Sequence, residues 1–185
     1  MGVGVAAGKR TVAWMVLGSF FVFLEMPAVL YVRGYYLKYQ PYFSSPIHLL
    51  GSRIPLRNDA YGKGYFGASR NGGRKHKGID ILAPMGSQIT APKSGRVTLA
   101  VEEKGYGKWI EVLHADGLVS RYAHLSVIRV SSGDWVSKGQ IIGLSGKSGN
   151  ATNPHIKPHL HFEIRYRSQP LNPTLGLLEP GLSLS

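Results

Sequence analysis

Two short motifs carry side chains that can bind a metal ion. The first, His76-Lys-Gly-Ile-Asp80, places an imidazole and a carboxylate four residues apart. On a strand or on a helix this separation puts both side chains on one face, so both can reach a single cation. Gly78 and the β-branched Ile79 and Ile81 disfavour a helix here. Taken alone, a pair of this kind is more often exposed and without a ligand than metal-binding.

The second motif, His159-Leu-His161-Phe-Glu163, alternates polar and apolar residues. This alternation predicts a strand that packs its apolar face into the core and projects two imidazoles in parallel from the other face. A solvated strand face that happens to carry two histidines is an equal alternative for this motif alone. A further imidazole, His124, ends another predicted strand. These histidines and Asp80 offer more ligands than the three protein ligands that a catalytic zinc uses, so two imidazoles remain for acid–base work.

Composition narrows the chemistry further. The 185-residue chain contains no cysteine, which excludes disulfides, thiolate metal ligands and thiol catalysis. Any metal must therefore be held by His, Asp or Glu. The formal net charge is +12, and the basic excess lies mostly upstream of residue 76. Because no nucleic-acid-binding motif accompanies this charge, we expect an anionic polymer or lipid surface as partner and no nucleic acid.

The elements that position these side chains are expected to be short strands. Twenty-four glycines and eleven prolines indicate many tight turns. Turn signals at 104–107 and 115–117 separate short apolar runs, and no helical period follows residue 56. The runs are 89–91, 95–101, 108–113, 118–123 and 127–130. This spacing predicts an all-β fold, an antiparallel sandwich or barrel over about residues 50–178.

An apolar segment precedes this domain. Residues 12–32 are apolar except for Ser19 and Glu25, and about twenty such residues can span a bilayer as a helix. Lys9 and Arg10 precede it, as they would precede a signal anchor or a cleaved signal peptide. Small residues are not placed for cleavage, which favours the anchor. The predicted organisation is a cytoplasmic N-terminus (1–10), a transmembrane signal anchor (11–32), a linker (33–55), the folded domain (56–178) and a C-terminal tail (179–185).

Six segments, in this order, resemble the LytM/lysostaphin-type zinc metallopeptidases, which hydrolyse peptidoglycan. Each segment alone is only suggestive, but the ordered set is highly specific. The segments are 65–70 (YFGASR), 76–80 (HKGID), 91–97 (APKSGRV), 122–125 (YAHL), 133–143 (GDWVSKGQIIG) and 158–163 (PHLHFE). The resemblance implies the fold of that family, an antiparallel barrel-sandwich known as the duplicated hybrid motif.

The resemblance also implies roles for individual residues. It assigns one Zn²⁺ to His76, Asp80 and His161, and it makes His124 and His159 the catalytic imidazoles. A zinc ion polarises the scissile carbonyl and lowers the pKa of its bound water towards ~7. His159 is favoured as the base that takes the water proton, with the other imidazole stabilising the oxyanion, and the reverse assignment stays open. Arg70 matches the basic residue that ends its segment and is expected to position the substrate or brace the site.

Three segments have weaker interpretations. Residues 150–157, which include His155 and Lys157, exceed the short Gly-rich link expected in the family, so they form either a specificity wall or a plain surface loop. Residues 33–60 are a hypothetical latency plug, with Asn58 or Asp59 reaching the zinc. His114 lies in a predicted turn before Asp116 and Gly117 and is expected to be exposed.

The leading prediction is a membrane-anchored zinc metalloendopeptidase that hydrolyses peptide bonds in peptidoglycan cross-links or stems. Its catalytic domain would face the periplasm or the cell exterior, with the N-terminus inside. A rival is a non-catalytic relative that binds the wall or activates a wall amidase, and the complete His/Asp set argues against it. A sugar-phosphotransferase-like or biotinyl-like carrier is a third candidate, since 133–143 also resembles those folds. Such a carrier would need a phosphorylatable histidine pair or a modified lysine.

Overall fold

The structure, a computed structural model, describes residues 28–48, 52–175 and 177–185, and the chain divides into two compact units, 1–39 and 40–185. In the first unit, residues 28–39 form a helix. Most of the predicted transmembrane segment, 11–27, lies outside the described residues. Within the described ranges, no helix has both the length and the apolar character needed to cross a membrane.

The second unit consists mostly of β-strands, which confirms the predicted class. The strands are β1 (Arg53–Ile54), β2 (Asn58–Asp59), β3 (Gly62–Lys63), β4 (Ile79–Leu82), β5 (Gln88–Thr90), β6 (Gly95–Glu103), β7 (Gly107–His114), β8 (Leu118–Ile128), β9 (Trp135–Val136), β10 (Ile141–Ser145), β11 (His159–Tyr166), β12 (Gln169–Leu171) and β13 (Ser183–Leu184). Two short 3-10 helices, η1 (Asn71–Gly73) and η2 (Gly149–Thr152), interrupt them in the described part of the chain. The expected absence of longer helices after residue 56 holds for these described residues.

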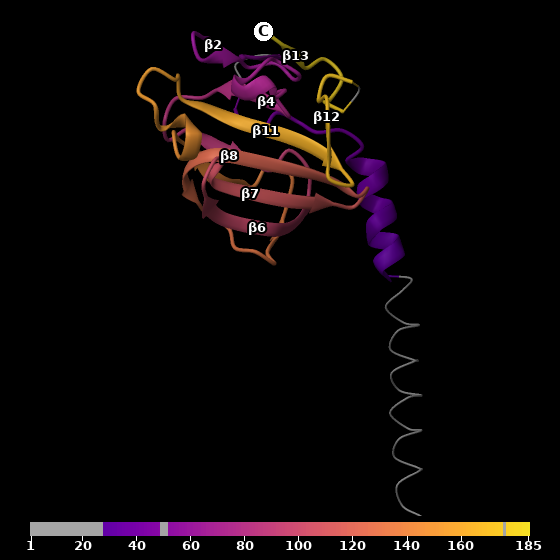
Figure 1. Cartoon of the computed structure of the whole chain (residues 1–185). Coiled ribbons are helices and arrows are strands. Elements are labelled where there is room, and N and C mark those ends of the chain that lie inside the picture. Colours follow the sequence, from indigo (N-terminus) through magenta and orange to yellow (C-terminus); the bar gives the residue numbers. More distant parts are fainter. Residues whose placement is uncertain (1–27, 49–51, 176) are drawn as a thin grey trace, which may run out of the picture. The chain divides into compact units, whose positions relative to one another are not determined.

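An antiparallel sheet carries the fold, and β11 lies near its centre. Among the described residues it has nine strands, with β12, β11, β8, β7, β6 and β9 adjacent in that order. Strand β4 pairs with β11, while β10 pairs with both β8 and β5. Figure 1 shows β4, β11, β8, β7 and β6 following one another across the sheet. The register places Asp80 of β4 on one side of His161 and Ala123 of β8 on the other.

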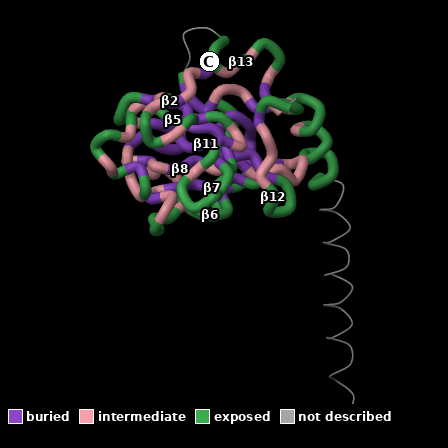
Figure 2. The backbone as a smooth tube through the Cα atoms, turned by 45° about the horizontal axis from the view of Figure 1, so that its top comes forward, coloured by how far each residue is buried: buried purple, intermediate pink, exposed green. Residues whose placement is uncertain are grey.

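The apolar side chains of β11 enter the core as the alternation predicted. Leu160, Phe162 and Ile164 are fully buried, and they belong to a cluster that extends over β4, β7, β8 and β10. The ring of Phe162 packs 5.5 Å from that of Tyr122. Figure 2 shows this burial concentrated along the central strands, with exposed residues in the turns. The histidine face of β11 is also covered, so it is not the solvated face considered as an alternative.

The folded unit extends further at both ends than the predicted domain. Phe43, Ile47 and Ile54, in the expected linker, are buried in the core. In the expected tail, β13 pairs in parallel with β1, and the amide of Leu56 donates to the carbonyl of Ser185 at 2.7 Å. Both ends of the unit are joined to the rest of the fold through isolated bridges and two-residue strands. Such pieces are too short to show the period-2 alternation from which strands are predicted.

Candidate active site

Three ligand atoms converge at the edge shared by β4 and β11. One donor atom from each of His76, Asp80 and His161 lies within 4.8 Å of the others, and all three residues are buried. Nε2 of His76 is 2.9 Å from Oδ1 of Asp80, and Nδ1 of His161 is 2.8 Å from the same oxygen. Strand pairing sets Asp80 opposite His161, while His76 comes from the irregular segment that leads into β4. The structure therefore brings together the three residues expected to bind a metal.

Hydrogen bonds on the far side of each imidazole determine which nitrogen faces the cluster. Nδ1 of His76 lies 2.9 Å from the carbonyl oxygen of Tyr65, so it must carry the proton and donate. Nε2 of His161 lies 2.9 Å from Oε1 of Glu163 and donates to that carboxylate. The opposite nitrogens, Nε2 of His76 and Nδ1 of His161, are the ones left to bind a metal. Partners of this kind orient metal-binding histidines and fix their tautomer.

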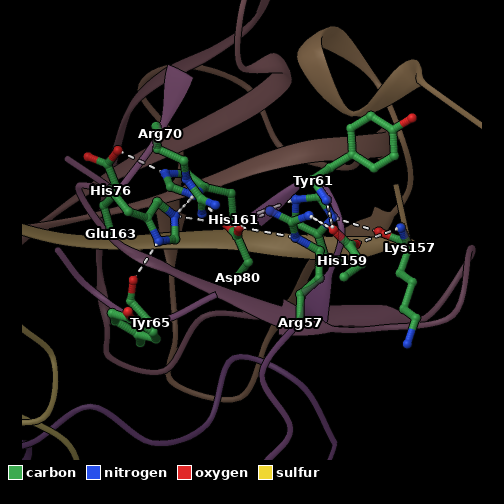
Figure 3. Close-up of polar contacts among 11 residues, drawn as sticks. Arg57, Tyr61, Tyr65, Arg70, His76, Asp80, Lys157, His159, His161 and Glu163 are labelled. Carbon is green, nitrogen blue, oxygen red and sulfur yellow. Dashed lines mark hydrogen bonds and ion pairs between the residues drawn. The ribbon is translucent and has the colours of Figure 1, made fainter. Parts of the chain in front are cut away.

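Two guanidinium groups hold the other oxygen of Asp80. Oδ2 accepts from Nε and Nη2 of Arg57 at 3.2 and 2.9 Å and from Nη2 of Arg70 at 2.6 Å. Figure 3 shows these contacts around the carboxylate. Burial opposes ionisation of Asp80, but hydrogen bonds from His161 and His76 hold its pKa well below the usual range. Asp80 is therefore a carboxylate that presents Oδ1 to the cluster.

A buried network of hydrogen bonds, centred on Glu163, holds His161 in place. Glu163 accepts from His161 and, through Oε1, from the hydroxyl of Tyr106 at 2.6 Å, while Oε2 accepts from Nη1 of Arg165 at 2.5 Å. Despite its burial, the hydrogen bond from His161 lowers the pKa of Glu163 to about 2. Burial and the neighbouring Glu163 raise the pKa of Tyr106 to about 12. Glu163 is thus ionised and Tyr106 protonated at neutral pH.

The two remaining imidazoles lie beside the metal-binding cluster. The rings of His124 and His159 are 5.0 Å apart, and that of His124 is 5.9 Å from His161. Nδ1 of His124 donates to the carbonyl of Ser148 at 2.9 Å, and Nδ1 of His159 donates to that of Lys157 at 2.7 Å. Each imidazole therefore keeps Nε2 as its free acceptor. Nε2 of His159 lies 3.9 Å from Oδ1 of Asp80.

Burial keeps both of these histidines neutral. Burial, reinforced by the neighbouring His161 and His159, lowers the pKa of His124 to about 3. Burial also lowers the pKa of His159, although Asp80 acts in the opposite direction. The backbone of His124 has a φ of 63°, in the left-handed region that non-glycine residues seldom adopt. Conformational strain of this kind persists where surrounding structure enforces it, often in active sites.

The donor set fits zinc. Two imidazole nitrogens and one carboxylate oxygen are the three protein ligands of a catalytic zinc, which keeps a fourth position for water. In this cluster every other polar atom of the three ligands is already engaged, by Tyr65, Glu163, Arg57 and Arg70. Only the three converging atoms are left to coordinate an ion, which is what a built metal site requires.

The cluster opens into a cavity of about 440 Å³. One group of lining side chains is basic and exposed, and we call it the basic rim: Arg74, Lys75, Lys77 and Lys104. A second group, the loop wall, consists of Tyr61, Asn150, Ala151 and Ile156. The ring of Tyr61 stacks on that of His155, with centroids 6.1 Å apart and planes 5° from parallel. With the exposed Glu103 as the acidic member of the same lining, the exposed charges remain mostly positive, so the cavity is suited to a ligand with negative charge.

The structure tests several expectations about individual residues. Arg70 braces Asp80 and lines the cavity, in line with one of its two expected roles. Asp59 does not reach the cluster, whereas Arg57 does. The expectation for His114 was wrong: it is buried, bonded to Ser94 and Ser120, and its burial lowers its pKa to about 4.

Three residues have roles in the site that no sequence motif indicates. Glu163 was part of a recognised segment, and its place in the alternation of His159 and His161 was a usable signal for a side chain on their face. Tyr106 lies in a predicted turn, and Arg57 lies at the start of the predicted domain, just after the linker. Neither carries a spacing that would have revealed its contact.

Comparison with known proteins places these features in a family. The family model described as peptidase family M23 matches residues 74–173. DD-carboxypeptidase/endopeptidase Mpg from Neisseria meningitidis is 40% identical over 111 residues, which are 60% of this chain and 25% of that protein. Murein hydrolase activator NlpD from Salmonella dublin is 39% identical over 109 residues, 58% of this chain and 27% of that protein. The chain thus spans about a quarter of the length of these curated relatives.

The fold also matches solved structures. A zinc-containing peptidase from Vibrio cholerae superposes with a TM-score of 0.56 at 27% identity. The match covers 71% of this chain and 41% of that one. The resemblance seen in the six sequence segments is therefore confirmed at the level of family and fold.

Proposed function

This chain belongs to peptidase family M23, and from that membership we propose that it is a zinc-dependent endopeptidase that hydrolyses peptide bonds in peptidoglycan cross-links or stems. One observation carries the proposal: the three metal-binding side chains and two further imidazoles line the same cavity. A relative without peptidase activity has no need of this complete set.

His76, Asp80 and His161 would hold the metal. When bound, a zinc ion polarises the scissile carbonyl and activates a water molecule. His124 and His159 each present an unprotonated Nε2 at neutral pH, because their Nδ1 protons are committed to carbonyl oxygens. Either can accept the proton of the attacking water and return it to the leaving amine. A protonated His159 would lie beside the carboxylate of Asp80, and this favours His159 as the base.

The basic rim supports peptidoglycan as the substrate. Stem peptides carry free carboxylates, and a cavity lined by one sign of charge raises the local concentration of ligands of the opposite sign. Arg74, Lys75, Lys77 and Lys104 are exposed at the cavity and can pair with such groups. Arg57 and Arg70 are committed to Asp80 and are not available for this purpose.

An activator of a wall amidase is the second candidate, because a murein hydrolase activator is among the relatives. The two functions separate in one experiment on residues 40–185, which form a compact unit. Zinc-loaded protein and its His124→Ala variant are incubated with purified peptidoglycan, and released fragments are identified by mass. Zinc-dependent release of uncross-linked stems, lost in the variant and with chelator, supports the endopeptidase. Release only when an amidase is added, unchanged in the variant, supports the activator.

We further propose that the protein is anchored in the cytoplasmic membrane with its catalytic domain outside. The support is the apolar character of residues 12–32 together with the location of peptidoglycan. Protease treatment of intact and permeabilised cells tests this. Digestion of the domain after opening the outer layers alone agrees with the proposal, and protection until the cytoplasmic membrane is broken contradicts it.

A further inference from the structure

A buried ion pair between Arg57 and Asp59 connects the three-residue cluster to the segment that holds His159. Nη1 of Arg57 donates to Oδ1 of Asp59 at 2.7 Å, and both side chains are less than a tenth exposed. The same guanidinium donates to Oδ2 of Asp80 through Nε and Nη2. Arg57 therefore bridges a metal-binding carboxylate and a second carboxylate that binds no metal.

The second carboxylate continues the chain of contacts towards the catalytic histidine. Oδ2 of Asp59 accepts from the backbone amide of Lys157 at 3.3 Å, and Oδ1 accepts from that of Tyr61 at 2.9 Å. The carbonyl of Lys157 in turn accepts from Nδ1 of His159 at 2.7 Å. Asp80, Arg57, Asp59, Lys157 and His159 thus form one continuous series of contacts. Figure 3 labels Asp80, Arg57, Lys157 and His159.

We propose that Asp59 is a positioning residue that aligns the metal ligand Asp80 with the catalytic base His159. It acts on Asp80 through Arg57 and on His159 through the backbone of Lys157. The catalytic part of this inference rests on the proposed peptidase function. Asp59 touches neither metal nor substrate in this arrangement. It acts by fixing the two groups that do.

The negative charge of Asp59 should also strengthen metal binding. Two guanidinium groups, those of Arg57 and Arg70, surround one carboxylate oxygen of Asp80. Without Asp59, the guanidinium of Arg57 would be neutralised by Asp80 alone and would repel a divalent cation bound to that carboxylate. Loss of geometry and loss of charge compensation therefore act in the same direction, and both weaken metal binding.

Asp59 also joins the loop wall to the site. Its bonds to Tyr61 and Lys157 hold the turn between β2 and β3 against residues 150–157, where His155 stacks on Tyr61. Residues 150–157 are therefore not a plain surface loop, because the carbonyl of Lys157 at their end orients His159. Movement of the loop wall would be transmitted to the base.

The alternative is that the Arg57–Asp59 pair only stabilises the fold. A matched control tests this alternative, because Lys93 and Asp116 form another ion pair with a fully buried cation. Asp116 also accepts a backbone amide, that of Leu118, at 3.0 Å. Neither Lys93 nor Asp116 lines the active-site cavity. Asp59→Asn and Asp116→Asn therefore each remove a charge from a comparable pair.

The experiment compares residues 40–185 with these two variants. Zinc dissociation constants are measured by chelator competition, and kcat and KM are measured at saturating zinc on a cross-linked peptidoglycan dimer. We expect Asp59→Asn to weaken zinc binding about 10- to 100-fold, the usual effect of losing an outer partner of a metal ligand. At saturating zinc, kcat should fall by about tenfold and KM should change less, because the base is displaced. Asp116→Asn should leave the zinc constant and kcat unchanged.

Wild-type zinc affinity in Asp59→Asn, or equal losses in both variants, would overturn the proposal. If circular dichroism shows that metal-free Asp59→Asn does not fold, Arg57→Lys decides in its place. Lysine keeps the charge, but its single ammonium cannot bridge two carboxylates as the guanidinium fork does, so zinc should again bind more weakly. The zinc measurement needs no substrate. A wild-type protein that binds zinc but cleaves no peptidoglycan would contradict the peptidase function and still leave this test decisive.

Discussion

Asp80 and His161 lie directly opposite each other in the β4–β11 pair, with Oδ1 and Nδ1 2.8 Å apart. The backbone ladder that holds the sheet together also sets the distance between two of the proposed metal ligands. A one-residue slip of either strand would turn its own ligand to the other face of the sheet and separate the two, so the register is as much a part of the site as the ligands. His76 is different: it is held through the carbonyl of Tyr65, outside the regular strands.

The first prediction concerns Glu163, which orients His161. Glu163→Gln removes the charge that accepts from Nε2 of His161 and leaves Arg165 and Tyr106 without their anionic partner. We expect zinc affinity to fall about 10- to 100-fold, measured by chelator competition. Asp116→Asn serves as the control, since it lies outside the cavity. Unchanged affinity in Glu163→Gln would show that the carboxylate does not support the ligand.

The second prediction is a proton released when zinc binds. In the metal-free chain, His161 is buried, but hydrogen bonds to Asp80 and Glu163 raise its pKa to about 9. Below that pH, zinc must displace a proton from Nδ1, so apparent affinity should rise with pH up to about 9 and fall about tenfold per unit below it. Calorimetric titration at pH 7 in buffers of different ionisation enthalpy should show about one proton released. No dependence on the buffer would contradict this.

The third prediction concerns stability in acid. Burial lowers the pKa of His114 to about 4, against about 6.5 in an unfolded chain. The unfolded state therefore binds more protons between these values, so this contribution to stability is complete above pH 6.5 and is lost as pH falls to about 4. The loss amounts to about 3 kcal/mol. Urea unfolding of metal-free His114→Gln should show lower stability at pH 7 but a smaller decrease towards pH 4 than the wild type. If the free energy of unfolding falls equally with pH in the two proteins, the burial of His114 does not cause the loss of stability in acid.

The convergence of the expected ligands could be read from local sequence, whereas the contacts at the two ends of the folded unit could not. The alternation in His159–Glu163 and the pair His76 and Asp80 identified side chains that the structure brings together, because ligand spacing within a strand is a local property. Phe43 and β13 join the core through contacts distant in sequence and too short to be periodic. Local pattern carries no information about such contacts.

The same distinction explains why some partners of the site were missed. Arg57 reaches Asp80 across 23 residues of chain, and Tyr106 reaches Glu163 across 57. His114 lay in a turn by sequence, but the segment that includes Phe43 packs against it, with ring centroids 5.1 Å apart. Burial by a segment distant in sequence could not be read from the residues around His114.

The fourth prediction tests the basic rim. Lys77→Glu combined with Lys104→Glu reverses two exposed charges at the cavity without touching Asp80 or the imidazoles. We expect KM for a peptidoglycan dimer to rise about tenfold at low salt with kcat little changed, and the difference to shrink at 1 M salt, where screening is strong. Arg96→Glu combined with Arg129→Glu is the matched control, because it reverses the same number of charges at exposed residues that do not line the cavity. An equal rise in that variant would attribute the effect to net charge.

The last prediction separates metal binding from catalysis. His124 and His159 lie beside the metal-binding atoms and are bonded to carbonyl oxygens through Nδ1. Replacing either by alanine should lower kcat about 10²- to 10⁴-fold, the usual contribution of a positioned acid–base group, while one zinc per chain is still bound. If both imidazoles serve the same proton transfer, the double variant should lose little more than the worse single variant, because residues that act as a unit are not additive. Zinc content by elemental analysis and kcat on a peptidoglycan dimer measure the two properties separately. Full multiplication of the two losses would mean that His124 and His159 act in different steps, and loss of zinc from either variant would mean that it is a ligand.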